Sequence, residues 1–382
     1  MALLMIPEGE AVQGVFDEIY EGDNLDIEAS QSERASIFEF SYTIGRIGRH
    51  EVVLAYMPGM GKVNAANIAS SLRSSFIDLK LVLLVGICGG VPNGLDNSEI
   101  VLGDIIISKN VVQSDFGKQY PEGFERKNTV SNNLRETGLE IRLFLENIED
   151  NKKILGEKTS KNLISLLERP GFEEVKYPGA HEDKLFPPDY LHQHHDTQDC
   201  GCHEGQTCSV ARQSPCELLG CDPELLARER PRARQGQNPA IHFGSVASGD
   251  AVIKCGMYRD QIARQENVIA FEMESAGIWE LLPCFMVKGV CDYADSHKNK
   301  KWQLYAAATA AACAQATLEL WDRRSQQRPS RNRVSNGGKN SERTKLLGQV
   351  VSPDPSPSFT SYGSMVAIQG GIVNAQGAIF NQ

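Results

Sequence analysis

The sequence predicts an α/β fold, a three-layer sandwich with a mostly parallel central sheet. Residues 80–86 (KLVLLVG) contain a continuous apolar run, as expected of a strand buried on both faces, and residues 104–112 (DIIISKNVV) are interpreted as another such strand. Segments with helical periodicity alternate with such runs along the chain, which is the pattern of parallel strands joined by helices. The composition, with 41% hydrophobic and 23% charged residues, is that of a soluble globular protein.

The elements before residue 178 follow from periodicity and from turn residues. A short strand is expected over residues 3–6, and an amphipathic helix over 8–20, where Val12, Phe16 and Ile19 recur at helical spacing. The other elements expected here are strands over 38–44, 52–57, 80–86 and 104–112, and helices over 61–71 and 131–168.

The second half repeats the pattern after a long interruption. Residues 178–240 are irregular and rich in His, Cys, Pro and Arg, and they are too many for an ordinary connection. Strands are expected over 241–247, 268–271 and 285–290, and an alanine-rich helix over 301–321. We therefore expect one domain over residues 1–322 that contains a Cys/His-rich insertion.

The C-terminal part differs in charge and composition. Residues 323–345 carry eight Lys or Arg and one acid, a local charge of +7. Because the net charge of the whole chain is −10, the remaining residues together carry −17. A basic, disordered linker is expected over 323–358. Residues 359–382 contain no charged side chain and many Ile, Val, Gln and Asn, which is typical of segments that stack as cross-β assemblies. A docked strand or helix, or plain disorder, is the alternative.

Several classes of protein are disfavoured. The chain contains no apolar run of about 18 residues and no basic start followed by an apolar core, so neither a membrane span nor a signal peptide is expected. The net charge of −10 argues against nonspecific nucleic-acid binding. Five cysteines stand singly among apolar or small residues, as buried thiols do, which favours a reducing, cytoplasmic location. They are Cys88, Cys255, Cys284, Cys291 and Cys313.

Four short polar segments each follow a predicted buried strand, where ligands gather in open α/β sheets. The glycines of residues 86–90 (GICGG) allow a ligand to approach the backbone, or they simply end the strand. In residues 248–250 (SGD), Asp250 is either a site residue or the cap of the next helix.

The other two segments carry carboxylates. Glu272 and Glu274 follow the strand over 268–271, and a carboxylate there can accept two hydrogen bonds from a ribose diol. Asp292 ends the strand over 285–290, where poor solvation favours a protonated carboxyl that can act as a general acid. Asp295 is expected to be a helix cap or a structural partner.

In their joint order and spacing, the motifs resemble the nucleoside phosphorylase and nucleosidase superfamily, in particular the methylthioadenosine/adenosylhomocysteine nucleosidases. The motifs are GICGG at 86–90, GD at 103–104, SGD at 248–250, FEMES at 271–275 and GVCDYAD at 289–295. Further stretches resemble the nucleosidase-like domain of fungal NOD-like immune receptors, over about residues 1–322. These stretches are DFGK at 115–118, LFPPDY at 185–190 and CDYADSHKNKKW at 291–302.

The resemblance implies a nucleoside phosphorylase-like fold and a role for each site residue. Asp292 corresponds to the acid that protonates N7 of a purine, Glu274 to the residue that binds the ribose hydroxyls, and Glu8 to the carboxylate that orients the attacking water. The implied substrate contacts are Met273 at the sugar, Val252 and Ile253 beside the base, and Gly89, Gly90, Ile87, Phe271, Phe116 and Lys254 around them.

The reaction implied is hydrolysis of adenine nucleosides or nucleotides, including ATP or dATP, with no cofactor. Phosphorylases of the superfamily bind phosphate through an Arg and a Ser or Thr where this chain has Leu84 and Ile87, which cannot bind an anion. Phosphorolysis and a catalytically silent nucleotide sensor are the alternatives. Several basic positions are candidates for binding the phosphates of a nucleotide, and the alternative is that they are ordinary surface charges. They are Lys118, Lys254, Arg259 and residues 298–301.

The resemblance also implies partners. Members of the superfamily are usually oligomers, so a homo-oligomer is expected, and residues 359–382 resemble the motifs that connect fungal immune receptors to effectors. An immune effector with a NOD-like receptor partner follows from this.

The insertion has the composition of a metal site. Zinc favours Cys and His ligands, and a structural zinc bound by Cys200, Cys202, His203 and Cys208 is one interpretation. A mobile flap with ordinary thiols is the other. No catalytic metal is expected, because the cleavage needs none.

Overall fold

The computed structural model describes residues 2–5, 9–20, 42–94, 98–127, 134, 137–196, 200–202, 206–228 and 238–326. The described residues all belong to one compact unit. The expected assembly segment 359–382, and the expected linker beyond residue 326, lie outside them and stay predictions.

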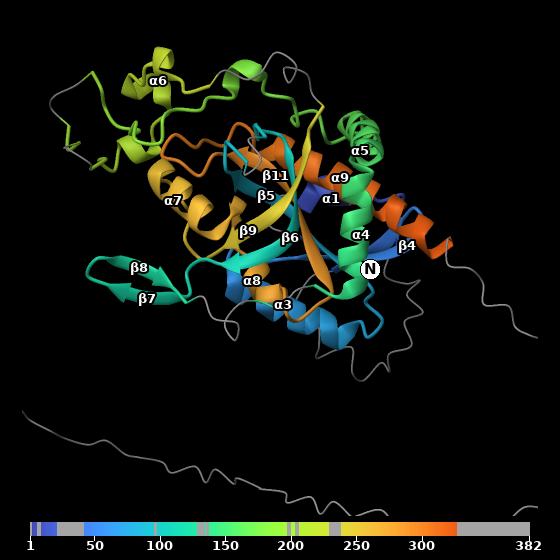
Figure 1. Ribbon diagram of the computed structural model, residues 1–382. Helices are drawn as coiled ribbons and strands as arrows, with labels where there is room; N and C mark the ends of the chain where they lie inside the picture. The colour runs from blue at the N-terminus through green and yellow to red at the C-terminus, as the bar shows by residue number, and fades with distance from the viewer. Residues whose placement is uncertain are drawn as a thin grey trace, which may run out of the picture. The chain divides into compact units, whose positions relative to one another are not determined.

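Nine strands of the described chain form one sheet, in the order β10-β9-β6-β11-β5-β1-β4-β3-β2. In chain order these are β1 (Ala2–Met5), β2 (Glu18–Ile19), β3 (Tyr42–Ile47), β4 (His50–Tyr56), β5 (Val82–Gly90), β6 (Ile105–Gln113), β9 (Ile241–Ser248), β10 (Val268–Glu272) and β11 (Cys284–Asp292). A separate hairpin of β7 (Gly117–Tyr120) and β8 (Gly123–Arg126) extends from the end of β6 (Figure 1).

The α/β class is confirmed, but the sheet is mixed where the sequence predicted a mostly parallel one. Parallel ladders join β1 to β4 and β5, β5 to β11, and β9 to β6 and β10. Antiparallel ladders join β6 to β11 and β5 to β10, so five strands close into a ring of pairings. The glycines at the end of β5 permit this closure, because Gly89 pairs with both Asp292 and Phe271. At this end the sheet therefore closes on itself and does not form the flat central layer of a sandwich.

Helices cover both sides of the sheet (Figure 1). Their bounds are α1 (Gly9–Gln13), α3 (Lys62–Ser75), α4 (Leu139–Asp150), α5 (Lys152–Leu167), α6 (Cys216–Leu219), α7 (Gly256–Glu266), α8 (Ser275–Ile278) and α9 (Gln303–Gln326). The long helix α9 packs on β5, β11 and α5. Its buried face is mostly alanine, which allows close approach: a Cβ added at Gly289 on β11 would lie 1.9 Å from the Ala306 carbonyl oxygen.

Some predicted elements differ from the observed ones. The helix expected over 8–20 ends at Gln13, and β2 follows within the same stretch. Val12 and Phe16 are buried as the periodicity predicted, but Ile19 is exposed on β2. The helix expected over 131–168 begins at Leu139 and is divided at Asn151 into α4 and α5. Local pattern predicted which apolar residues are buried more reliably than where the chain turns.

The hairpin β7–β8 was not predicted. Its strands are almost wholly exposed, so its sequence carries no alternation between buried and exposed positions. Of the five single cysteines, four are buried as expected, whereas Cys255 is exposed at the start of α7.

The insertion is attached to the main body. It contains short helices, of which α6 is the longest described. The guanidinium of Arg228 donates to the carbonyl oxygens of Pro92 and Ile100 and to the Tyr293 hydroxyl, at 2.8–2.9 Å. These bonds attach the end of the insertion next to β11.

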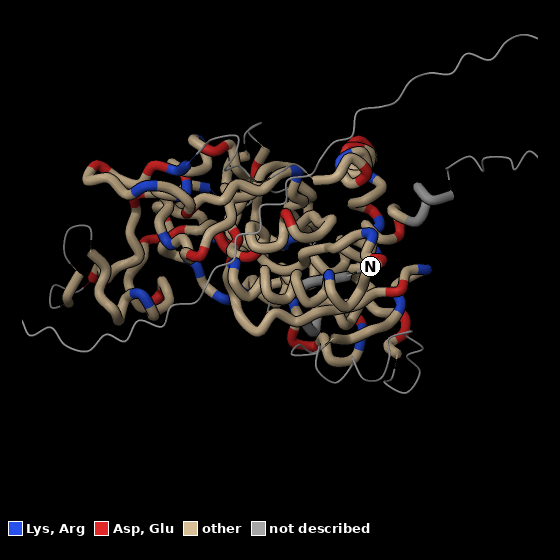
Figure 2. Tube along the Cα trace, turned by 90° about the horizontal axis from the view of Figure 1, so that it is seen from below, with Lys and Arg blue, Asp and Glu red and all other residues tan. Residues whose placement is uncertain are grey.

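Charges are dispersed over the described surface, with acidic and basic residues interspersed along the chain (Figure 2). Among the described helices, none has both the length and the apolar character needed to cross a membrane.

Candidate active site

Asp292 is the last residue of β11 and is buried, with 6% of its side chain exposed. Its Oδ1 accepts a hydrogen bond from the Ala294 amide at 2.8 Å, and its Oδ2 lies 3.0 Å from the Lys298 Nζ. Ala294 has a positive φ of 51°, which turns the chain back toward the carboxylate. The ammonium compensates the charge of a carboxylate that burial leaves poorly solvated.

Two further carboxylates, those of Glu272 and Glu274, lie at and just beyond the end of β10. The Glu272 carboxylate accepts from the backbone amides of Glu274 and Ser275 and from the Ser275 hydroxyl, so it caps α8. The Glu274 carboxylate is not used in this cap; its Oε2 lies 3.2 Å from the Lys288 Nζ. Glu274 is therefore the better placed of the two to accept hydrogen bonds from a ribose diol.

Lys288 is the counter-charge of this pair and is fully buried within β11. Burial opposes its charge, but the carboxylates of Glu274 and Glu272 outweigh burial and hold the pKa of Lys288 above its ordinary value. Burial also raises the pKa of Glu274; Lys288 opposes this rise and Glu272 adds to it. One ammonium thus lies close to two buried carboxylates.

The carboxylates are brought together through β5. Gly89 is the register partner of Asp292 on β11 and of Phe271 on β10, next to Glu272. The two segments that the sequence separates by about 20 residues therefore end on either side of one glycine. The sequence grouped them only because each follows a buried strand.

We expect Gly89→Ala to lower the rate of base release strongly and the thermal stability of the protein only slightly. The new Cβ would lie 2.9 Å from Asp292 Oδ1 and 3.0 Å from the Ala294 Cβ, so the carboxylate has to move. Displacement of a reacting group by an ångström costs about 100-fold in rate. Base release and thermal unfolding of the variant measure the two effects.

Gly156→Ala is the matched control, because a Cβ there meets nothing within 4 Å in the middle of α5. It is expected to keep full activity. Equal activity of Gly89→Ala and the wild type would show that Asp292 is not held against β5 as described.

The other predicted contact residues lie on the surrounding loops and strand ends. Gly90 and Phe271 are buried, and Ile87, Met273 and Ile253 are half-buried. Phe116 and Val252 are exposed by 43% and 45%, and Lys254 is exposed as well. Glu8, the expected water-orienting residue, lies outside the described residues.

An ion network links three of these loops. Lys62 Nζ lies 2.7 Å from the Asp115 carboxylate and 3.4 Å from that of Asp250. Asp250 Oδ1 accepts from the Lys62 amide, so it binds the first residue of α3 rather than capping α7, the next helix along the chain. The Asp115 carboxylate also accepts from the Asp250 amide, and this hydrogen bond and Lys62 lower its pKa, although burial opposes this.

Two of the basic residues considered for phosphate binding interact with other parts of the protein. Arg259 is buried, and its guanidinium donates to the Tyr293 carbonyl and lies 3.9 Å from Asp295. Lys301 pairs with Glu182 at 2.8 Å. Asp295 accepts from the His297 amide, in agreement with the structural role expected of it.

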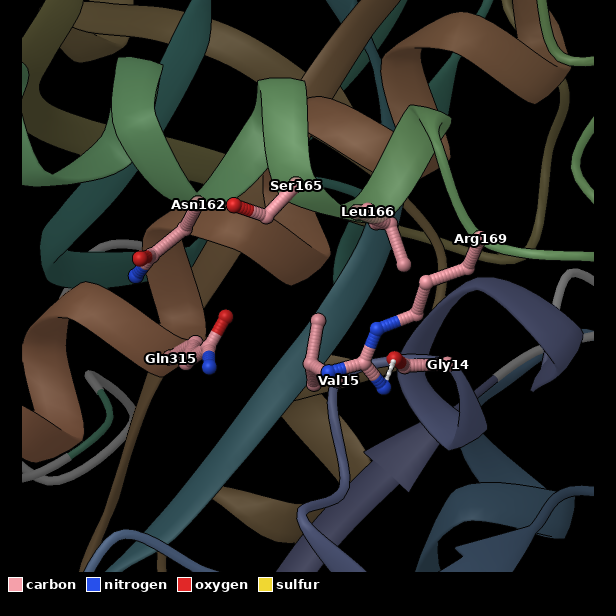
Figure 3. Close-up of a pocket in the computed structure, with 7 residues that line it drawn as sticks. All are labelled: Gly14, Val15, Asn162, Ser165, Leu166, Arg169 and Gln315. Carbon is pink, nitrogen blue, oxygen red and sulfur yellow. Dashed lines mark hydrogen bonds between the residues drawn. The ribbon is translucent and has the colours of Figure 1, made fainter.

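A pocket of about 180 Å³ lies elsewhere, between α5, α9 and the end of α1 (Figure 3). Its lining contains none of the predicted site residues, and the Arg169 guanidinium within it is bonded to the carbonyl oxygens of Gly14 and Phe16.

The residues considered for zinc divide differently from the prediction. Cys202 and Cys208 lie together with His194, and the predicted ligand His203 is outside the described residues. Cys200 lies beside them, since its sulfur accepts from the Cys202 amide. A second group contains three residues of the Cys/His-rich insertion, His192, Cys216 and Cys221, together with His297, which the sequence did not connect with them.

Lys288 is the functional residue that sequence reasoning missed. A charged residue in the middle of an otherwise apolar strand (CFMVKGVCD) was the available signal, since such a residue needs a buried partner. The pairing of Lys298 with Asp292 was hidden in a run of lysines that resembles an ordinary charged surface.

Known proteins with similar sequences indicate the family of this chain. The family model of the Phosphorylase superfamily matches residues 15–164. A nucleotide-binding leucine-rich repeat (NLR)-like protein from Hyaloscypha variabilis is 32% identical over 294 residues, 73% of this chain. The chain spans only 25% of that relative's length.

Two nucleosidases are more distantly similar. A 5'-methylthioadenosine/S-adenosylhomocysteine nucleosidase from Mycobacterium bovis is 22% identical over 76% of this chain and 88% of its own length. The crystal structure of such a nucleosidase from Neisseria meningitidis, in complex with methylthio-immucillin-A, is 16% identical with a TM-score of 0.47, covering 83% of this chain and 98% of its own. The family match and the similar sequences show that this chain belongs to the nucleoside phosphorylase/nucleosidase superfamily.

Proposed function

We propose that this chain hydrolyses the N-glycosidic bond of adenine nucleosides or nucleotides and releases free adenine. The observation that carries the proposal is the placement of a buried Asp292 at the end of β11 and a buried Glu274 two residues beyond β10, two strands that both pair with Gly89 of β5. One carboxylate can meet the base and the other the sugar of a single bound nucleoside. The similarity to a methylthioadenosine/adenosylhomocysteine nucleosidase supports a purine substrate.

The chemistry assigns a step to each group. Asp292 donates a proton to the departing base, which lowers the barrier to breaking the glycosidic bond. Lys298, 3.0 Å from Oδ2, then stabilises the carboxylate that remains. Glu274, held by Lys288, accepts hydrogen bonds from the ribose hydroxyls and favours the positive charge that develops on the sugar.

Water is the proposed nucleophile rather than phosphate. Leu84 is buried and Ile87 is half-buried, both within β5, and neither side chain can donate a hydrogen bond to an anion. Glu8 is the proposed residue that orients the water.

Product analysis tests the reaction class. The full-length protein is incubated with adenosine, methylthioadenosine, ATP and dATP, with and without inorganic phosphate, and bases and sugars are separated by chromatography. We expect free adenine and a reducing sugar at a rate that phosphate does not change. A sugar 1-phosphate formed only with phosphate would establish a phosphorylase, and no base from any of these substrates would favour the silent sensor.

The finer proposals rest on the similarity to an NLR-like protein. We propose a cytoplasmic homo-oligomer that acts on ATP or dATP as an immune effector, with residues 359–382 as the segment that contacts a NOD-like receptor. Lys118 and Lys254, which are exposed, are the candidate phosphate contacts. A clear preference for adenosine over ATP in the same assay would contradict the nucleotide substrate.

A further inference from the structure

A group of four metal-binding side chains lies between the insertion and the loop after β11. It consists of His192, Cys216, Cys221 and His297, whose ligand atoms all lie within 4.8 Å of one another. Three come from the insertion, and His297 comes from the loop that carries Lys298. Both histidines are buried, and both cysteines are half-buried.

The distances between the atoms are those of a tetrahedral site. Cys216 Sγ lies 3.5 Å from His192 Nδ1 and 3.6 Å from His297 Nδ1, and Cys221 Sγ lies 3.7 Å from His192 Nδ1. Zinc bonds of about 2.3 Å to sulfur and about 2.05 Å to nitrogen, at the tetrahedral angle, place such atoms about 3.6 Å apart. These three sulfur–nitrogen distances are therefore the ones that a shared zinc ion would impose.

The orientation of the imidazoles agrees with metal binding. His192 Nε2 lies 2.8 Å from the Ser214 carbonyl oxygen, and His297 Nε2 lies 3.0 Å from that of Tyr190. A carbonyl oxygen can only accept, so Nε2 carries the hydrogen in both neutral rings and Nδ1 presents a lone pair. Ligating histidines are usually oriented in this way by a backbone carbonyl or a carboxylate.

Hydrogen bonds among the four groups explain only part of the arrangement. Cys216 can donate its S–H to His297 Nδ1 and Cys221 to His192 Nδ1, but the third contact, 3.5 Å between Cys216 Sγ and His192 Nδ1, is then left without a hydrogen. A cation at the centre satisfies both lone pairs and both sulfurs at once. All ten cysteines are free thiols, so no disulfide accounts for the proximity of Cys216 and Cys221.

We propose that these four residues bind a structural zinc ion that fastens the insertion to the loop after β11. Two sulfur and two imidazole ligands in tetrahedral geometry are the donor set that zinc prefers, and four protein ligands leave no open position for catalysis. His297 stacks on Phe186 at 4.1 Å between ring centroids, which shields the centre from water.

The ion has a consequence for the candidate active site. Lys298, the residue after the ligand His297, pairs with Asp292 at 3.0 Å. The His192 amide also donates to the Ser296 hydroxyl at 3.2 Å, on the same loop. Zinc binding at His297 therefore fixes the loop that places the Lys298 ammonium beside the proposed acid.

Native mass spectrometry of the full-length protein, expressed in medium supplemented with zinc sulfate, tests the proposal. The wild type is expected to carry one more zinc ion per chain than Cys216→Ser, and Cys216→His, which keeps a ligand, is expected to retain the ion. Cys255→Ser is the matched control, because that thiol is exposed and outside the group. Elemental analysis gives the zinc content independently.

Two results would overturn the proposal. One is an equal zinc content in the wild type and folded Cys216→Ser. The other is a wild-type protein that binds no zinc. A zinc-free protein whose mass is lower by two hydrogens, because Cys216 and Cys221 form a disulfide, counts as this second result. Should Cys216→Ser fail to fold, Cys221→Ser and removal of zinc from the wild type with a chelator, followed by thermal unfolding, give the same comparison.

We propose a second zinc site, on separate observations, at His194, Cys202 and Cys208. Both sulfurs lie 3.6 Å from His194 Nδ1, and backbone amides donate to all three sulfurs when Cys200 is included. Such N–H···S bonds stabilise ligating thiolates. Cys202→Ser is expected to lose one zinc that Cys216→Ser retains, and an unchanged zinc content would reject this second ion.

Discussion

Asp292→Asn is expected to lower the rate of adenine release by about 10²–10⁴-fold, the contribution of a positioned general acid. The amide oxygen can still accept from the Ala294 amide, as Oδ1 does at 2.8 Å, so the loop keeps its conformation. The amide nitrogen cannot give up a proton at the rate needed, and Lys298 no longer faces an anion. Steady-state release of adenine measures the effect, with circular dichroism to verify the fold.

The control for Asp292→Asn is the same change at an exposed carboxylate. Asp78 is 96% exposed and lies 3.9 Å from Lys80, a contact of little energetic value. Asp78→Asn is expected to match the wild type. An Asp292→Asn protein with wild-type turnover would exclude the proton donor proposed here while leaving the family and the fold intact.

Lys288→Met is expected to lower the free energy of unfolding by about 3–5 kcal/mol, because it leaves buried carboxylates without their counter-charge. Lys288 is 1% exposed, and its Nζ lies 3.2 Å from Glu274 and 3.8 Å from Glu272. Lys80→Met, at a lysine that is 75% exposed, is the matched control and should change stability little. Urea unfolding of the two variants gives the comparison.

The same variant makes a prediction about pH. The pKa of Glu274 is already raised by burial, with Lys288 opposing the rise, so loss of the lysine raises it further. Because the ionised carboxylate is the form proposed to accept the ribose hydrogen bonds, kcat/KM falls as the pH drops through this pKa. The acid limb of the pH profile therefore moves to higher pH in Lys288→Met. Adding Glu274→Gln restores part of the stability but not the activity, and an acid limb that stays in place would contradict the role given to Glu274.

The sequence by itself determined the class of fold, most of the strands and helices, and the segments that form the site. Buried strands such as β5 and β11 are unmistakable because both their faces are apolar, and a carboxylate directly after such a strand is conspicuous. The same local reasoning failed where no periodicity exists, as in the exposed hairpin β7–β8, or where a turn interrupts a helical pattern, as after Gln13.

Only the tertiary structure decided which groups are partners. Nothing in the order of residues indicates that β5 pairs with both β10 and β11, or that this pairing places Asp292 and Phe271 on either side of Gly89. Likewise, the composition of the insertion suggested a zinc site with Cys200 and Cys202, whereas the four-ligand group needs His297, which lies 81 residues from Cys216. Ion pairs and metal sites act across a few ångströms of space, and separation along the chain does not limit which residues the fold brings within that range.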